Sequence, residues 1–178
     1  KKKLDVLFLT DPIDTFWLSM AGEFQDRKFV SITKGDIDLT AFSDDKKEKE
    51  KKPPAGMKGL VEKIKEILGE SVQDVKVSTK LVDSACCLVA PDTGMDVQME
   101  RIMKIQNKDF KGMPRILEIN PDHNIIKKLN KIKDTDKDAL NDASFLLFDQ
   151  AKMVEGELPN DIAKFNQRMS KFLGIALS

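Results

Sequence analysis

The stretch ASFLLFDQAKMV, residues 143–154, is apolar over most of the circumference of the helix that its spacing predicts. A helix with one apolar stripe covers one partner, whereas this helix, expected over residues 136–155, needs partners on two sides. A second apolar helix is expected over residues 159–177, with a length of about 28 Å at 1.5 Å per residue. The sequence therefore predicts that the chain closes with a helical hairpin.

The residues alone leave two arrangements of this hairpin open. Both helices could pack on their own domain, or two chains could each contribute a hairpin to a four-helix bundle with two-fold symmetry. We favour the homodimer, because the FLLF run at 145–148 exceeds what one small domain covers. The predicted dimer interface consists of apolar residues at helical spacing: Leu140, Leu147, Phe148, Ala151, Val154, Ile162, Phe165, Met169, Phe172 and Leu173.

Upstream of the hairpin, helical and strand-like segments alternate. Residues 4–33 have the pattern of a small βαβ unit, whose helix begins with Asp11 as N-cap and Pro12 at the first position. A helical stripe from Met57 to Leu68 ends at Gly69. Strands are expected within 75–79, 84–91 and 115–120, and Asn120-Pro121 is expected to open a further helix. This order of elements predicts the α+β class.

A block of charged residues separates two regions of the chain. The segment SDDKKEKEKKPPAG, residues 43–56, cannot bury a core, and its two prolines and glycine are typical of a linker. The predicted organisation is therefore an α/β part over residues 1–42, the linker over 43–56, and an α+β domain over 57–178.

The composition excludes several classes of protein. Lys+Arg and Asp+Glu are both 30, and this zero net charge argues against a nucleic-acid partner. No apolar run approaches the ~18 residues of a membrane span. Two adjacent cysteines, Cys86 and Cys87, provide no disulfide framework, which fits a reducing cytoplasm. The chain starts without methionine or a signal-peptide pattern, so we expect it to be a piece of a longer cytoplasmic protein.

No motif predicts catalysis. The sequence lacks a Gly-rich phosphate loop and a G-x-S-x-G elbow, and its single histidine, His123, makes a zinc site of the usual kind unexpected. His123 is expected to be a structural residue in the first turn of a helix, and the pair Asp11 and Asp14 stands at a predicted helix start, where capping explains it. We expect no catalytic residue, no metal and no cofactor in this chain. A small α/β enzyme that uses residues 4–33 is the weaker alternative.

Methionines form a second apolar stripe within MDVQMERIMKI, residues 95–105. Met95, Met99, Ile102 and Met103 follow the spacing of one helix face. From periodicity alone this face is either the inner side of a core helix or an apolar surface open to partners. Methionine packs against many shapes, so the second interpretation would suit variable ligands.

Several segments resemble the 90-kDa heat-shock chaperones, most closely the bacterial HtpG type. The resemblance runs in order along almost all 178 residues, and EINPDH at 118–123 and DPID at 11–14 are its most specific parts. The segments that carry it are DPIDTFW (11–17), KLVDSACCLVAP (80–91), MERIMK (99–104) and LEINPDHNIIKKL (117–129).

The resemblance implies a role for each region. Residues 1–42 would be the end of the family's middle domain, and the remainder its C-terminal dimerisation domain. The whole protein would be an ATP-driven homodimeric clamp for non-native client proteins, with the site for ATP and Mg in an N-terminal domain outside this chain. The chain ends FLGIALS, without the acidic tail that recruits co-chaperones in eukaryotic members.

The resemblance also implies a client-binding surface. The family's methionine-bearing helix contacts clients, and the aromatic start of the DPIDTFW helix adds a second apolar surface. The client-binding residues that it implies are Phe16, Trp17, Met95, Met99, Ile102 and Met103. We therefore expect a dimerisation and client-binding region of a chaperone that is not itself an enzyme. The alternative is a dimeric scaffold without client binding, with the methionine stripe internal.

Overall fold

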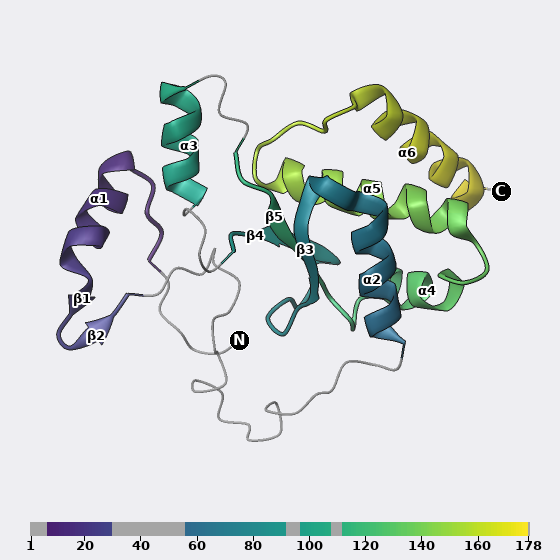
Figure 1. The fold of residues 1–178 in the computed structure, drawn as a ribbon, viewed down its shortest axis with the longest axis horizontal. Helices are drawn as coiled ribbons and strands as arrows, with labels where there is room; N and C mark the ends of the chain where they lie inside the picture. Colours follow the sequence, from purple (N-terminus) through teal and green to yellow (C-terminus); the bar gives the residue numbers. More distant parts are fainter. Residues whose placement is uncertain (1–6, 30–55, 92–96, 108–111, 178) are drawn as a thin grey trace. The chain divides into compact units, whose positions relative to one another are not determined.

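The computed structural model describes residues 7–29, 56–91, 97–107 and 112–177. The chain divides into two compact units (Figure 1). One unit consists of Lys1–Lys51 together with Ala90–Met113, and the other consists of Lys52–Val89 together with Pro114–Ser178.

A three-stranded sheet forms the centre of the second unit, with strand order β3-β5-β4. The strands are β3 (Val72–Val77), β4 (Cys86–Val89) and β5 (Arg115–Ile119). The central strand β5 runs parallel to β3 and antiparallel to β4, and all five of its residues are buried. Its alternate residues Leu117 and Ile119 belong to the hydrophobic core. Between them, Glu118 accepts a hydrogen bond from Ser78 Oγ at 2.8 Å.

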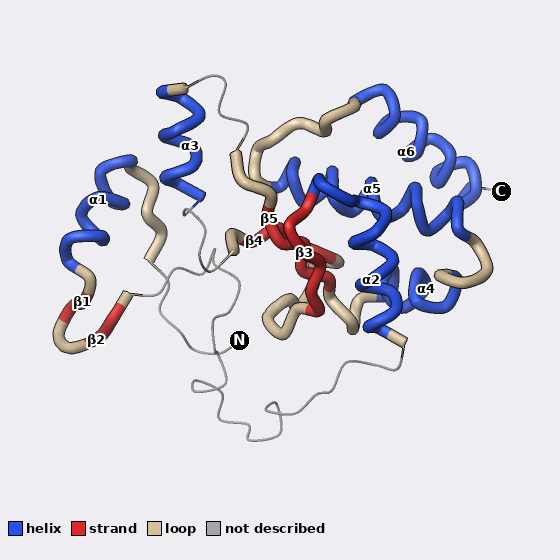
Figure 2. The backbone as a smooth tube through the Cα atoms, in the orientation of Figure 1, coloured by secondary structure: helices blue, strands red, loops and turns tan. Residues whose placement is uncertain are grey.

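Three helices build the core together with this sheet (Figure 2). They are α2 (Met57–Leu68), α4 (Asn124–Ile132) and α5 (Lys137–Val154). Helix α2 packs against β3, α5 packs against β4, and the two helices also contact each other. The innermost apolar side chains come from elements far apart in sequence: Met57, Leu60, Ile64, Leu117, Ile119 and Ile126.

Local signals explain where these helices begin and end. Helix α2 ends at Gly69, whose positive φ of 51° is a backbone conformation that glycine adopts without strain. The 3-10 turn η3 (Gly69–Ser71) then leads directly into β3. Helix α5 begins with Asp136, whose carboxylate accepts a hydrogen bond from the Ala139 backbone N–H at 2.9 Å. The last helix, α6 (Ile162–Leu177), lies alongside α5 (Figure 1).

The described part of the first unit contains two helices and a short hairpin. Helix α1 (Pro12–Ala21) packs against α3 (Val97–Gln106), and β1 (Glu23–Phe24) pairs with β2 (Arg27–Lys28) in antiparallel orientation. Asp11 is the N-cap of α1, and the backbone N–H of Asp11 donates a hydrogen bond to the Asp14 carboxylate at 3.1 Å. The predicted capping role of these two aspartates is confirmed.

The α+β class is confirmed, whereas two local predictions need correction. Residues 7–10, expected in the first strand of a βαβ unit, form no strand, and α1 is followed by the short β1–β2 hairpin. The rest of that expected unit, residues 4–6 and 30–33, lies outside the described residues. Asn120 does not cap a helix: its side-chain amide donates to the Val82 and Ser84 carbonyls at 3.1 and 3.0 Å.

Helix α4 begins after Asn120, because a different residue caps it. His123 is the N-cap, and its Nδ1 accepts a hydrogen bond from the Ile125 backbone N–H at 3.2 Å. His123 therefore has the structural role expected of a helix start. The predicted linker lies outside the described residues except for Gly56, and the predicted domain boundaries stay a prediction.

Candidate functional site: the α5–α6 hairpin and the α1–α3 surface

Helix α5 is covered on most sides by its own chain. It contacts α2, α4, β4 and α6, so the two-sided packing that its composition demands is met within one protomer. Within the FLLF run, Leu147 and Phe148 are buried and Phe145 packs against the same core, so this run does not by itself require a second chain. The dimer stays a prediction. Four residues predicted for the dimer interface lie in this core: Leu140, Leu147, Phe148 and Ala151.

The other predicted interface residues remain at the surface of the protomer. Phe165 and Phe172 on α6 are half-buried, and Phe172 packs against the core. Ile162, Met169 and Leu173 are 52%, 40% and 53% exposed and, at spacings of seven and four residues, share one face of α6. Val154 at the end of α5 is also exposed. Helix α6 contains no buried residue among those described, Ile162–Leu177.

Charged side chains join α6 to α5. Asp142 on α5 accepts a hydrogen bond from Arg168 Nε at 3.4 Å and one from Lys171 Nζ at 2.6 Å. The Arg168 guanidinium also lies over the Phe145 ring, with its Cζ 4.4 Å from the ring centroid. This group of contacts holds the middle of α6 against α5.

The connection between the two helices is tied to the start of β5. Arg115 forms ion pairs with Glu155 and, at 3.2 Å, with Glu157. Lys152 Nζ donates to Asn160 Oδ1 at 2.6 Å. Together these contacts fix the turn that sets the direction of α6.

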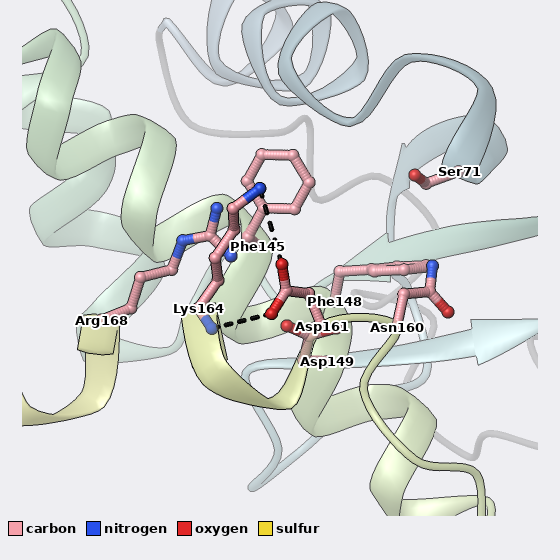
Figure 3. Close-up of a pocket in the computed structure, with 8 residues that line it drawn as sticks. All are labelled: Ser71, Phe145, Phe148, Asp149, Asn160, Asp161, Lys164 and Arg168. Carbon is pink, nitrogen blue, oxygen red and sulfur yellow. Dashed lines mark hydrogen bonds and ion pairs between the residues drawn. The ribbon is translucent and has the colours of Figure 1, made fainter. Parts of the chain in front are cut away.

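A small pocket opens between the start of α6 and α5 (Figure 3). It encloses about 150 Å³. Asp149 on α5 is 5% exposed, and its burial raises the pKa of its carboxyl group above the ordinary value, while Arg168 and Lys152 act in the opposite direction. The lining residues are Ser71, Phe145, Phe148, Asp149, Asn160, Asp161, Lys164 and Arg168.

The first unit exposes apolar side chains on α1. Phe16 is 50% exposed, and Trp17 is 53% exposed and contacts the Phe29 ring edge-on, with 5.9 Å between ring centroids. On α3, Ile102 and Met103 are half-buried. Met95 and the side chain of Met99 lie outside the described residues, so the predicted stripe is only half visible. Phe16, Trp17, Ile102 and Met103 thus belong to two helices that pack together.

The chemistry of the remaining candidates is structural. Burial raises the pKa of the Cys86 thiol to about 12 and that of the Cys87 thiol to about 11, so neither is an activated nucleophile. In the described ranges, no three His, Cys, Asp or Glu side chains come together as a metal-binding group. Within the same ranges, none of the helices has the length and apolarity that a membrane crossing requires.

Sequence reasoning missed Asp149 and Arg115. For Asp149 a signal existed, because it is a charged residue that directly follows the apolar FLLF run. For Arg115 no signal existed, since its partners Glu155 and Glu157 lie about forty residues along the chain.

The sequence comparisons agree with the resemblance in the residues. The sequence profile of the family described as "Hsp90 protein" matches residues 1–178. The chain is 38% identical over 177 residues to a protein named "Chaperone protein HtpG" from Mesorhizobium japonicum. It is 39% identical over 173 residues to the protein of that name from Burkholderia ambifaria, and 37% identical over 180 residues to that from a Wolbachia species. Each match covers 97% of this chain.

The chain therefore belongs to the Hsp90 family of chaperones. Within the family it is similar to the bacterial HtpG proteins, and it spans 27–28% of the length of these relatives. It thus corresponds to a part of such a protein.

Proposed function

We propose that this chain is the C-terminal homodimerisation and client-binding region of an ATP-dependent, cytoplasmic chaperone. It joins two protomers through α6 and presents apolar side chains to non-native proteins. ATP and Mg bind to a part of the whole protein that this chain does not include, so the chain itself needs no cofactor and is not an enzyme.

The exposed apolar face of α6 carries the dimer part of the proposal. Ile162, Met169 and Leu173 share this face and leave about half of their surfaces exposed, whereas Arg168 and Lys171 on α6 contact Asp142 on α5. Each large apolar side chain removed from water contributes roughly 1.5–3 kcal/mol, and a two-fold interface counts each residue twice. Because most of α5 is already covered, α6 is the main contact surface, and α5 contributes its end at Val154.

Two negative charges introduced on this face of α6 by substitution test whether the face forms the dimer interface. Sedimentation equilibrium of Met169→Glu/Leu173→Glu should show a dissociation constant raised at least about 100-fold, because the carboxylates would be desolvated in the interface. The wild-type chain should sediment at twice its mass of 20.1 kDa. The melting temperature of the monomer should change little, because both residues are exposed within one protomer.

The matched control is Gln167→Glu, which adds a charge at an exposed position on another face of the same helix. It should leave the dissociation constant unchanged. A wild-type chain that is monomeric at micromolar concentration would contradict the dimer, as would a double variant that stays dimeric.

The exposed side chains on α1 and the neighbouring α3 support the client-binding part. Phe16 and Trp17 leave about half of their surfaces in water, and Ile105 at the end of α3 is almost fully exposed. Exposed apolar surface that the protomer does not bury is available for non-native proteins. The methionines of α3 suit partners of variable shape. This part of the proposal is tested by the excision described in the Discussion.

A further inference from the structure

The pocket in Figure 3 contains a buried carboxylate that the hairpin leaves without a partner. Asp149 is 5% exposed, and no hydrogen bond or ion pair reaches it from the residues that the structure describes. A buried charge without a partner costs stability, so such a group calls for a specific explanation.

Asp142, seven residues earlier on α5, is a carboxylate with more than one cationic partner. Asp142 binds two cations, Lys171 Nζ at 2.6 Å and Arg168 Nε at 3.4 Å. The contact with Arg168 is the longer of the two, and Asp142 keeps a cationic partner if Arg168 leaves.

Arg168 lies between the two carboxylates. Asp142, Phe145 and Asp149 are at positions i, i+3 and i+7 of α5 and share one face, with the two aspartates about 10 Å apart along the axis. The guanidinium of Arg168 stacks on the central residue, Phe145, at 4.4 Å. Arg168 and Asp149 also line the same pocket (Figure 3).

The other charged groups around the pocket already have partners. Lys164 on α6 pairs at 3.5 Å with Asp161, the residue directly before that helix. Lys152 on α5 pairs with Glu157 at 3.9 Å. The η3 turn contributes only the uncharged Ser71 to the lining. Arg168 is therefore the cation best placed to neutralise Asp149, and of the charged groups that affect the Asp149 pKa it lowers that pKa most.

We propose that Arg168 is shared between Asp142 and Asp149, and that the proton on Asp149 decides which carboxylate it binds. With Asp149 protonated, Arg168 stays with Asp142 and the pocket is open, as in this structure. When Asp149 loses its proton, Arg168 moves across Phe145 to Asp149 and fills the pocket, and Lys171 keeps Asp142.

In the second arrangement each carboxylate has one cation, so α6 is tied to α5 at two points along its length. This regulation rests on the proposed function, because α6 is the helix that we propose joins two protomers. We expect the dimer to be about fivefold tighter above the Asp149 midpoint than below it, since a better-held α6 loses less freedom on association.

Nuclear magnetic resonance of the 178-residue chain tests the arginine directly. Between pH 3 and 8 the Arg168 side-chain Nε signal should shift with the same midpoint as the Asp149 carboxyl carbon. Asp149→Asn, which keeps the shape of the side chain, should abolish that shift. An Arg168 signal that behaves alike in wild type and Asp149→Asn would overturn the proposal.

A second pair of variants keeps the test independent of Asp149→Asn. Arg168→Gln should raise the Asp149 midpoint by about one pH unit, because it removes the cation that neutralises Asp149. Lys171→Gln should raise this midpoint by less, because Arg168 stays available but leaves Asp142 without a cation when it moves. Equal effects of the two variants would show that Arg168 has no special relation to Asp149 and would overturn the proposal.

These signals belong to one protomer, so they test the shared arginine whether or not the chain dimerises. Sedimentation above and below the measured midpoint then tests the regulation. The predicted fivefold difference should disappear in Asp149→Asn. A dimer that is equally tight on both sides of the midpoint would overturn the regulatory part and leave the proposed dimer intact.

Discussion

Arg115 shows how one residue fixes the direction of a whole helix. Its side chain is buried at the first position of β5, where it forms ion pairs with Glu155 and Glu157 after the end of α5. A buried arginine must keep its charge, so it constrains any carboxylate that neutralises it. The turn into α6 is therefore held by the sheet.

Replacement of this arginine gives the residue-scale prediction. Arg115→Met keeps the apolar stem but removes the buried cation that pairs with both Glu155 and Glu157, so the free energy of unfolding should fall by roughly 1–3 kcal/mol. Urea unfolding followed by circular dichroism measures this change. The control Lys128→Met, at an exposed position of α4, should change it by less than about 0.5 kcal/mol. Equal values for the two variants would contradict the role of Arg115.

At the scale of one element, two glycines of α2 and its C-cap are in opposite situations. Gly59 lies inside the helix, and a Cβ there would meet only Lys133 Cε at an ordinary 3.6 Å. Gly69 follows the helix with a φ of +51°, and a Cβ there would meet nothing. Space is available at both positions, so the backbone conformation alone separates them.

The same substitution should therefore have opposite effects at the two positions. Gly59→Ala should raise the free energy of unfolding by about 0.5–1 kcal/mol, because alanine favours the helix and restricts the unfolded chain. Gly69→Ala should lower the free energy of unfolding by about 1 kcal/mol, because a side chain is strained at a positive φ. Chemical denaturation of the two variants measures both, and a shift in the same direction would contradict this explanation.

At the scale of the whole molecule, the segment that contains α3 interrupts a β-hairpin. Strands β4 and β5 pair in antiparallel orientation, with Val89 opposite Ile116. The chain leaves the sheet after Val89, contributes Ala90–Met113 to the other compact unit, and returns at Pro114. The ends of this excursion are close enough for a tight turn to join them.

Excision of this segment should separate dimerisation from client binding. When residues 91–114 are replaced by Asn-Gly, the second unit should keep its melting temperature within about 3 °C and still sediment as a dimer, since its core remains complete. Protection of a chemically unfolded protein from aggregation should fall at least tenfold. The matched variant Ile102→Ser/Met103→Ser should give the same loss without the deletion. Undiminished protection in both variants would favour a dimeric scaffold without client binding.

The sequence by itself determined the α+β class and most ends of the helices. Asp11 and Pro12 at the start of α1 and Gly69 at the end of α2 act through backbone groups within one helical turn. Such signals require no knowledge of distant neighbours. Asn120 gave the same local signal but is held by the Val82 and Ser84 carbonyls, so a tertiary contact replaced its expected role.

Only the tertiary structure decided which apolar faces are covered. The FLLF run of α5 finds its partners in α2, β4 and α6, and Cys86 Sγ even donates to the Leu147 carbonyl at 3.3 Å across 61 positions. The sequence shows how many apolar side chains a helix has, but it does not show whether the elements that pack against them belong to the same chain or to a second copy. For the same reason Asp149 is recognisable as a buried carboxylate only once α6 lies beside α5, because burial is a property of the packed elements.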